Sequence, residues 1–382
     1  MKLSVCIPYK ARLDNLTLAL EGLAAQTMCA DDFEVVVAAM EHAPEYVEVC
    51  RRFADRLDLI SVLSARDFHI PRARNLAMRG AMGEVVVQMD ADTLLPPDSL
   101  QNLWDHHFAF GQEVCVVGQV VGYGNNEDGD VDAVEVGSYD QHLKALTAMT
   151  EAEDWPGDAR FKVAHAIPWA FAWTGLIALP NHVVRRHGLY FDESFLGWGV
   201  DDLEWGYRVC ASRTPIVLSP DVYALHLPHI RDSAANRRTE EDNYGRFLRK
   251  WPARDVELSR TVGDVRANGM WCSYLADLRR ASGAAAFGVA RGMVAGHDVV
   301  RFGVPLDTAE QPVSPKHLTP FDAPDRVEIL PLTGMSLPYE DPNVDRCVVG
   351  AGIALLPPEL HEAVLREAGR LSQHVVVENT AG

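Results

Sequence analysis

Val85-Val86-Val87-Gln88-Met89-Asp90-Ala91-Asp92 is the stretch that decides the fold. Its first five residues form an apolar run that predicts a buried strand, and the acidic residues follow directly. Ligands of α/β sheets bind beyond the carboxyl ends of the strands, so both carboxylates are expected at a binding edge. Aspartates one residue apart can hold a hard divalent cation, which would neutralise a diphosphate. An isolated Asp-x-Asp turn is more often simply solvated, but the strand before it favours a metal site.

The segments before this stretch alternate between strands and helices. The patterns predict strands at 3–8 and 33–39, an apolar patch at 59–63, and helices at 13–25, 44–56 and 71–82. Such alternation predicts an α/β fold whose mainly parallel sheet has helices on both faces. Beyond Asp92 a proline-rich turn leads into a further helix, with Asp98 or Ser99 placed to cap it.

Composition excludes several classes of protein. The 382 residues carry a net charge of −19 with a pI near 5.1, which argues against a nucleic acid partner. Apolar stretches fall short of a membrane span, and the opening residues are too short for a signal peptide, so a cytoplasmic location is expected. The 7 cysteines lack Cys-x-x-Cys spacing, so neither a zinc site nor a disulfide framework is expected.

A second acidic cluster runs from Gly197 to Glu204 and begins Gly197-Trp198-Gly199. The glycines permit an irregular backbone, and the indole offers a flat face on which a sugar can stack. Asp201 and Asp202 follow at the expected start of a helix, where the helix dipole keeps carboxylates ionised. A carboxylate beside a bound hydroxyl is a competent general base. The plainer alternative is that these aspartates only cap a surface helix.

His226 and His229 follow a further expected strand. A neutral imidazole can complete the coordination of an ion such as Mn²⁺, although a lone histidine is more often structural. Upstream, the aromatic cluster around Trp173 would supply another wall for a sugar ring.

We expect two parts in the chain, a catalytic domain over 1–258 and a smaller accessory region over 259–382 that is helical and then α/β. The glycine- and acid-rich segment 122–137 is expected to be a mobile loop, either a lid or a plain surface loop. The last part faintly resembles the later half of a Rossmann-like methyltransferase, but no Gly-x-Gly-x-Gly loop precedes it, so no methyl transfer is expected.

Residues 1 to about 250 resemble the inverting glycosyltransferases of the GT-A fold, namely nucleotide-sugar family 2 and the animal galactosyl- and N-acetylgalactosaminyltransferases. Leu3–Lys10 looks like the family's first strand, and Ala73-Arg74-Asn75 looks like a segment near the diphosphate. Asp90-Ala91-Asp92 matches the Asp-x-Asp motif, in which the second aspartate commonly binds the metal. Phe195–Asp202 matches the segment that binds the acceptor and supplies the base.

The resemblance and the residue chemistry together assign the site. Asp202 is the expected base, and Asp201 is the neighbour that orients the acceptor. The expected metal ligands are Asp92, Asp90 and either His226, favoured by the N-acetylgalactosaminyltransferase pattern, or His229, which precedes Ile230-Arg231-Asp232 as in the galactosyltransferases. The expected donor-binding residues are Pro8, Tyr9, Glu41, Arg72, Arg74, Asn75 and Asp90. The expected acceptor-binding residues are Trp173, Gly197, Trp198, Gly199 and Asp201.

One departure from the family concerns the nucleotide base. Where the family usually has Asp-Asp-Gly-Ser, this chain has Ala38-Ala39-Met40-Glu41. The aspartate that reads the base is therefore missing, and Glu41 would have to serve from a shifted position. UDP follows only from the resemblance.

The expected reaction is a metal-dependent single displacement that inverts the anomeric carbon of a sugar carried by a nucleotide diphosphate. The expected donor is a UDP-linked hexose or N-acetylhexosamine. The cofactor would be Mn²⁺ or Mg²⁺, and the acceptor a glycan, a small molecule or a peptide. The sequence does not decide whether the protein forms a homo-oligomer. The alternatives are a nucleotidyltransferase, although no glycine-rich loop follows the first strand, and a catalytically silent carbohydrate-binding module.

Overall fold

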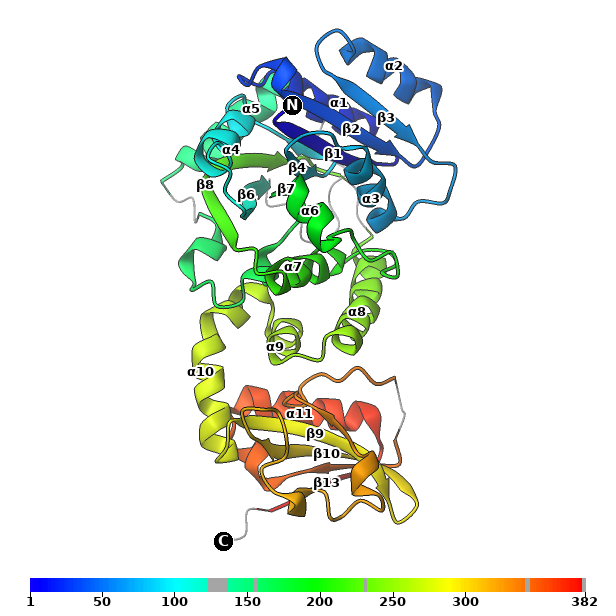
Figure 1. Cartoon of the computed structure of the whole chain (residues 1–382), viewed down its shortest axis with the longest axis vertical. Coiled ribbons are helices and arrows are strands. Elements are labelled where there is room, and N and C mark those ends of the chain that lie inside the picture. Colours follow the sequence, from blue (N-terminus) through cyan, green and yellow to red (C-terminus); the bar gives the residue numbers. More distant parts are fainter. Residues whose placement is uncertain (123–136, 154–156, 230–231, 341–343, 380–382) are drawn as a thin grey trace. The chain divides into compact units, whose positions relative to one another are not determined.

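The computed structural model describes residues 1–122, 137–153, 157–229, 232–340 and 344–379. The chain forms two compact units, the first made of 1–162 and 168–243 and the second of 163–167 and 244–382 (Figure 1). The predicted loop 122–137 lies outside the described residues except for its two ends. The functional boundary expected between residues 258 and 259 stays a prediction.

The first unit holds an eight-stranded sheet. Its strands are β1 (Leu3–Tyr9), β2 (Phe33–Ala39), β3 (Leu59–Leu63), β4 (Val85–Met89), β5 (Thr93–Leu94), β6 (Cys115–Gly122), β7 (Leu176–Pro180) and β8 (Ile216–His226). The helices are α1 (Leu13–Ala24), α2 (Pro44–Phe53), α3 (Ile70–Gly80), α4 (Ser99–His107), α5 (Tyr139–Glu151), α6 (Asn181–His187) and α7 (Asp201–Ala211), and α8 (Ser233–Lys250) begins here and ends in the second unit.

The strand order is β3-β2-β1-β4-β7-β6-β8-β5. Strands β3, β2, β1 and β4 run parallel, and β6 is parallel to β8, whereas β7 is antiparallel to both its neighbours. The expected α/β fold with a mainly parallel sheet is confirmed. The direction changes at β7, where Met89 of β4 pairs with Leu176.

Helices cover both faces of this sheet. Val5, Val35 and Val87 belong to a core that also takes in the apolar side chains of α1, α2 and α4. Side chains alternate along a strand, so the neighbouring residues point to the opposite face, where α3 brings Gly80 against Val36. A buried valine or leucine contributes roughly 1.5–3 kcal/mol, so these two layers fix the sheet from which the site emerges.

Helix α3 ends two residues before the predicted end at Met82. The backbone N–H groups of Met82 and Gly83 donate to the side chains of Glu34 (2.6 Å) and Ser4 (2.7 Å), which are themselves joined by a buried hydrogen bond of 2.5 Å. These long-range acceptors replace the helical carbonyls, so the helix stops.

The start of α4 also differs from the prediction. Neither expected capping side chain accepts a hydrogen bond from a backbone N–H of the first turn of the helix. Instead the Ser99 hydroxyl donates to the carbonyl of Tyr223 (2.9 Å), and Asp98 accepts from the amide of Asn102 (3.4 Å). Ser99 therefore ties α4 to β8.

The second unit has a five-stranded sheet in the order β11-β9-β10-β12-β13. The strands are β9 (Ala286–Val294), β10 (His297–Leu306), β11 (Glu328–Leu330), β12 (Arg346–Val349) and β13 (Val375–Val377), and the helices are α9 (Arg254–Val262), α10 (Asp264–Ser282) and α11 (Pro358–Leu371). The smaller C-terminal α/β region is confirmed as architecture. Across the described part of the chain, no helix has the length and apolarity that crossing a membrane requires.

A buried carboxylate organises one loop of the second unit. Glu257 of α9 accepts hydrogen bonds from the backbone N–H groups of Thr333, Gly334, Met335 and Ser336, at 2.8, 2.7, 2.7 and 3.3 Å. Burial raises the pKa of Glu257 to about 7, and the N–H donors oppose that shift.

Candidate active site

The short pairing of β5 with β8 brings Asp92 to both candidate histidines. Thr93 pairs with His226, and the Leu227 N–H donates to the carbonyl of Asp92 at 2.7 Å. His226 Nε2 lies 3.8 Å from Asp92 Oδ1, and His229 Nδ1 lies 3.2 Å from Asp92 Oδ2. The sequence left the choice of histidine open, and the structure gathers both around one carboxylate.

These three residues fit a divalent metal ion. One ligand atom from each lies within 4.8 Å of the others, and the Asp92 side chain is only 6% exposed. A carboxylate with two imidazoles is a donor set suited to a transition-series ion such as Mn²⁺. Asp90, the other expected ligand, does not belong to this group.

Asp90 instead contacts Arg74, which joins the two acidic clusters of the sequence. Arg74 Nη2 lies 3.3 Å from Asp90 Oδ1, and Nη1 lies 2.5 Å from Asp201 Oδ2. The guanidinium is buried and lies over the ring of Phe191 at 5.2 Å. Burial raises the pKa of Asp201, and the charge of Arg74 opposes it. The pair fixes the first turn of α7 against the end of β4.

Asp202 stands in a different environment although it follows Asp201. Its Oδ1 accepts a hydrogen bond from the Leu203 N–H at 2.9 Å. Burial and the neighbouring Asp201 charge raise the pKa of Asp202 to about 7. A carboxyl group with that pKa can exchange a proton near neutrality, which is what a general base requires.

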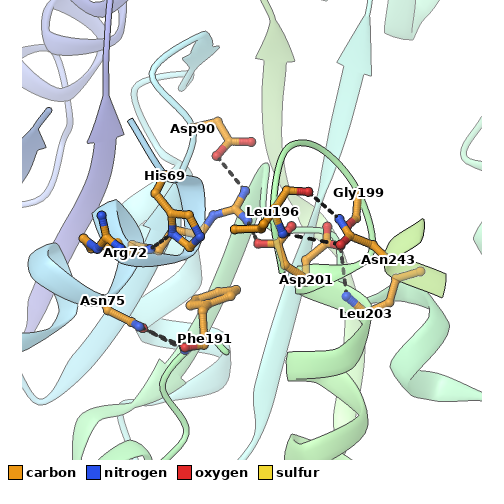
Figure 2. Close-up of polar contacts among 12 residues, drawn as sticks. His69, Arg72, Asn75, Asp90, Phe191, Leu196, Gly199, Asp201, Leu203 and Asn243 are labelled. Atoms are coloured by element: carbon orange, nitrogen blue, oxygen red, sulfur yellow. Dashed lines mark hydrogen bonds and ion pairs between the residues drawn. The ribbon is translucent and has the colours of Figure 1, made fainter. Parts of the chain in front are cut away.

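The Gly197-Trp198-Gly199 turn is held by α8. Gly197 and Gly199 have φ values of 74° and 99°, which only glycine adopts freely. The Asn243 amide donates to the carbonyls of Leu196 (2.9 Å) and Gly199 (3.0 Å), as Figure 2 shows. This anchoring directs the turn that leads into α7.

Thr239 of α8 holds the centre of the same turn, because its hydroxyl donates to the carbonyl of Trp198 at 2.9 Å. A Cβ on Gly197 would lie 2.6 Å from Thr239 Cγ2, so only glycine fits there. The Trp198 ring itself is 43% exposed. Neither Thr239 nor Asn243 carries a sequence signal near the motif, so sequence reasoning missed both.

A cavity of about 500 Å³ lies beside the carboxyl ends of β1 and β4 and is lined by residues that include Pro8 and Asp90. Of the predicted residues, those that line it are Pro8, Arg74, Asp90, Asp92, Gly197, Trp198, His226 and His229. Lining residues that the sequence did not single out as site residues are Lys10, Ala11, Arg12, Phe68, His69, Ile70, Ala91, Asp232 and Asn236. The metal residues and the tryptophan turn therefore face one space.

Two predicted donor residues at the ends of β1 and β2 are engaged elsewhere. Tyr9 is buried, and its ring stacks on Tyr46 with centroids 4.9 Å apart. Glu41 Oε1 accepts a hydrogen bond from the Ala11 N–H at 2.7 Å. Glu41 thus supports the backbone after β1, and its reading of a nucleotide base stays a prediction.

Six further predicted residues lie outside the cavity lining, namely Gly199, Asp201 and Asp202, whose contacts are given above, and Arg72, Asn75 and Trp173. Arg72 pairs with Glu193 at 3.3 Å, and Asn75 exchanges hydrogen bonds with the backbone of Phe191 at 2.9 and 2.7 Å. The ring of Trp173 lies 4.6 Å under the Arg160 guanidinium. Asn75 in particular ties α3 to the segment ahead of α7.

Arg12 is the most consequential lining residue that sequence reasoning missed. It is the third residue after the end of β1, and its Nη1 lies 2.5 Å from Asp92 Oδ2. The sequence did contain a signal for Arg12, because residues that follow β1 and β4 should lie close together. The two strands are parallel and end at the same edge of the sheet.

Residues 4–156 match the family model for "Glycosyl transferase family 2". The chain is also 31% identical over 268 residues to validoxylamine A glucosyltransferase of Streptomyces hygroscopicus subsp. jinggangensis. The alignment covers 67% of this chain and 62% of that protein. The chain therefore spans about three fifths of the length of this curated relative.

Solved glycosyltransferase structures resemble the chain more distantly. Residues 1–349 of S. aureus TarS in complex with UDP-GlcNAc align with a TM-score of 0.49 at 16% identity, over 70% of this chain and 69% of that one. The mannosyltransferase PcManGT of Pyrobaculum calidifontis in complex with GDP-Man and Mn²⁺ aligns with a TM-score of 0.47 at 19% identity, over 73% and 75%.

The family 2 match includes part of the site and omits the rest. It contains Asp90 and Asp92, and it ends before Trp198, Asp202 and the two histidines. The roles of these later residues therefore stand on their geometry and chemistry.

Proposed function

We propose that the protein is a metal-dependent, inverting glycosyltransferase that moves a sugar from a nucleotide-diphosphate sugar to an acceptor hydroxyl. The observation that carries this proposal is that Asp92, His226, His229 and Trp198 line one and the same cavity, in a chain whose residues 4–156 match glycosyltransferase family 2. The similarity to a glucosyltransferase supports a hexose as the transferred group.

The donor diphosphate would lie at the metal end of the cavity. Asp92, His226 and His229 would hold the ion, which supplies positive charge for the departing diphosphate. Lys10 and Arg12 line the same cavity and add two cationic groups in a chain of net charge −19. A UDP-linked hexose or N-acetylhexosamine is the donor class we propose.

The acceptor would lie at the tryptophan turn. Trp198 offers its exposed face to a sugar ring or another flat group. Asp202 accepts the proton of the attacking hydroxyl, while Asp201 is held in place by Arg74. Attack from the side opposite the diphosphate inverts the anomeric carbon.

The test is a panel of nucleotide-sugars, with UDP-glucose first, incubated with the purified protein with and without Mn²⁺. Release of nucleoside diphosphate from one donor is expected only with the metal, and Asp92→Asn should abolish it. Asp105→Asn, which removes an exposed carboxylate from α4, is the matched control and should leave release unchanged. Metal-independent release, or full release by Asp92→Asn, would contradict the proposal.

A further inference from the structure

Arg12 and the proposed metal ion need the same carboxylate, that of Asp92. Arg12 Nη1 lies 2.5 Å from Asp92 Oδ2, the oxygen that is also 3.2 Å from His229 Nδ1. Asp92 and His229 would both hold the ion, so the ion would lie close to the Arg12 guanidinium. A guanidinium in that position would repel the ion, because both are cations at close range in a partly buried setting.

The backbone delivers Arg12 to this position at a conformational cost. Ala11 and Arg12 have φ values of 53° and 57°, which side-chain-bearing residues rarely adopt. The conformation is held from both sides: Glu41 accepts from the Ala11 N–H at 2.7 Å, and the Arg12 carbonyl accepts from the Leu16 N–H at 3.0 Å, which begins α1. Strained backbone with such support is a feature of functional sites.

Arg12 also has access to the space where the diphosphate would lie. Its side chain is 43% exposed and lines the cavity together with Lys10, whereas the Asp92 side chain is 6% exposed. A guanidinium can bind a phosphate group through two parallel hydrogen bonds. Arg12 therefore has two possible anionic partners, Asp92 and the donor.

We propose that Arg12 is a tethered cation that competes with the divalent ion for Asp92 and, once displaced, pairs with the diphosphate of the donor. The inference rests on the proposed metal site. Its consequence is that diphosphate and metal promote each other's binding, because the diphosphate gives Arg12 a partner when the ion takes Asp92.

The first experiment measures Mn²⁺ binding to the full chain by calorimetry and by the EPR signal of free Mn²⁺, without nucleotide. Arg12→Met removes the charge and keeps the aliphatic stem, and should bind Mn²⁺ up to about fivefold more tightly, because a partly exposed ion pair contributes up to about 1 kcal/mol. Arg51→Met, an exposed arginine of α2, controls for the net charge change and should match the wild type. Arg12→Lys keeps a charge and should lie nearer the wild type than Arg12→Met.

The second measurement repeats the titration with inorganic pyrophosphate present. Pyrophosphate should tighten Mn²⁺ binding in the wild type by a larger factor than in Arg12→Met. Equal factors in the two proteins would overturn the second half of the inference.

Asp92→Asn separates failure of the inference from failure of the metal site. If Asp92→Asn loses Mn²⁺ binding but Arg12→Met binds no more tightly than the wild type, the metal site stands and the competition is refuted. If the wild type and Asp92→Asn bind Mn²⁺ equally or not at all, the metal site fails and the inference fails with it.

Discussion

Arg74 connects the end of β4 with the start of α7. Its buried guanidinium contacts Asp90 and Asp201, so both acidic clusters depend on one charge. Removing one partner of a buried ion pair leaves the other charge uncompensated in a low-dielectric site.

We therefore expect Arg74→Met to lower the free energy of unfolding by about 3–5 kcal/mol. Arg72→Met is the neighbouring control, because Arg72 is partly exposed and makes one ion pair at 3.3 Å; it should cost no more than about 1 kcal/mol. Urea unfolding of the two variants gives the comparison. Similar losses in both would refute the special role of the Arg74 pair.

Asp202 gives the proposed reaction a defined pH dependence. Its pKa is raised to about 7 by burial and by the Asp201 charge, and only the ionised form can accept a proton. We expect kcat/KM to rise with pH through about 7 and then level, and Asp202→Asn to lose at least about 10²-fold in rate. A pH–rate profile of the wild type, with Asp202→Glu as the variant that keeps a carboxylate, measures this. A profile flat between pH 5 and 8 in the wild type would contradict the assignment.

Asp202 should also make the stability of the fold depend on pH. Activity should rise with pH, whereas the stability that Asp202 contributes should fall. The folded protein binds the Asp202 proton more tightly than the unfolded chain, whose value is near 3.8. Stability from this group is therefore present below pH 3.8 and is lost as the pH rises to about 7. Asp202→Asn should lack this loss and so be more stable than the wild type at pH 8, by thermal unfolding. A variant no more stable than the wild type at that pH would refute the linkage.

At the scale of elements, the position of α7 depends on close contact at Gly206. A Cβ there would lie 2.9 Å from the Trp169 carbonyl oxygen and would collide with the Ala172 methyl group. Gly206→Ala should therefore displace α7 and cost about 1–3 kcal/mol, with loss of activity because Asp201 and Asp202 form its first turn.

Gly245→Ala is the matched control for this element. Gly245 lies in α8 with open space around its Cα, so alanine should be neutral or stabilise the helix by up to about 1 kcal/mol. Thermal unfolding and activity of both variants test whether the close contact at Gly206 positions α7. Equal effects of the two substitutions would show that the α7 contact is not limiting.

The elements that the sequence predicted well are those with a local cause. The valine-rich strands and the amphipathic helix at 13–25 depend on their own hydrophobic spacing, and the structure has β1, β2, β4 and α1 within about two residues of the predicted bounds. The end of α3 was mispredicted because it is set by Ser4 and Glu34, which are distant in sequence.

The same distinction applies to the site. The motif residues Asp92 and Trp198 can be recognised from the residues next to them in the sequence, and both line the cavity. The meeting of Asp92 with both histidines depends on a two-residue strand pairing, and the anchoring of the tryptophan turn depends on Asn243 in a later helix. Such contacts have no local pattern, so they appear only in three dimensions.

The molecule as a whole has two compact units, each with its own sheet. We therefore expect a substitution in one unit to change the free energy of unfolding of that unit and to leave the other unit unaffected. We expect Glu257→Gln to destabilise the second unit by about 2–4 kcal/mol, because the amide nitrogen cannot accept the backbone N–H bonds that the carboxylate accepts. Glu362→Gln, at an exposed site on α11, is the control.

Hydrogen–deuterium exchange resolves the effect of Glu257→Gln by segment. Faster exchange is expected at 333–336, while β1, β2 and β4 of the first unit keep their protection. Unchanged exchange at 333–336 would refute the role of the buried carboxylate.

The reversal of direction between β4 and β7 has an evolutionary consequence. Because Met89 pairs with Leu176, the chain that enters β7 must arrive beside the end of β4, where Asp90 begins. Residues inserted ahead of Leu176 would therefore add material at the rim of the active site without altering β1 to β4. Doubling the length of a surface loop costs only about 0.6 kcal/mol in closure entropy. Lineages that share this sheet could thus diversify their acceptors by changing loop length at one place, while the residues that handle the donor stay fixed.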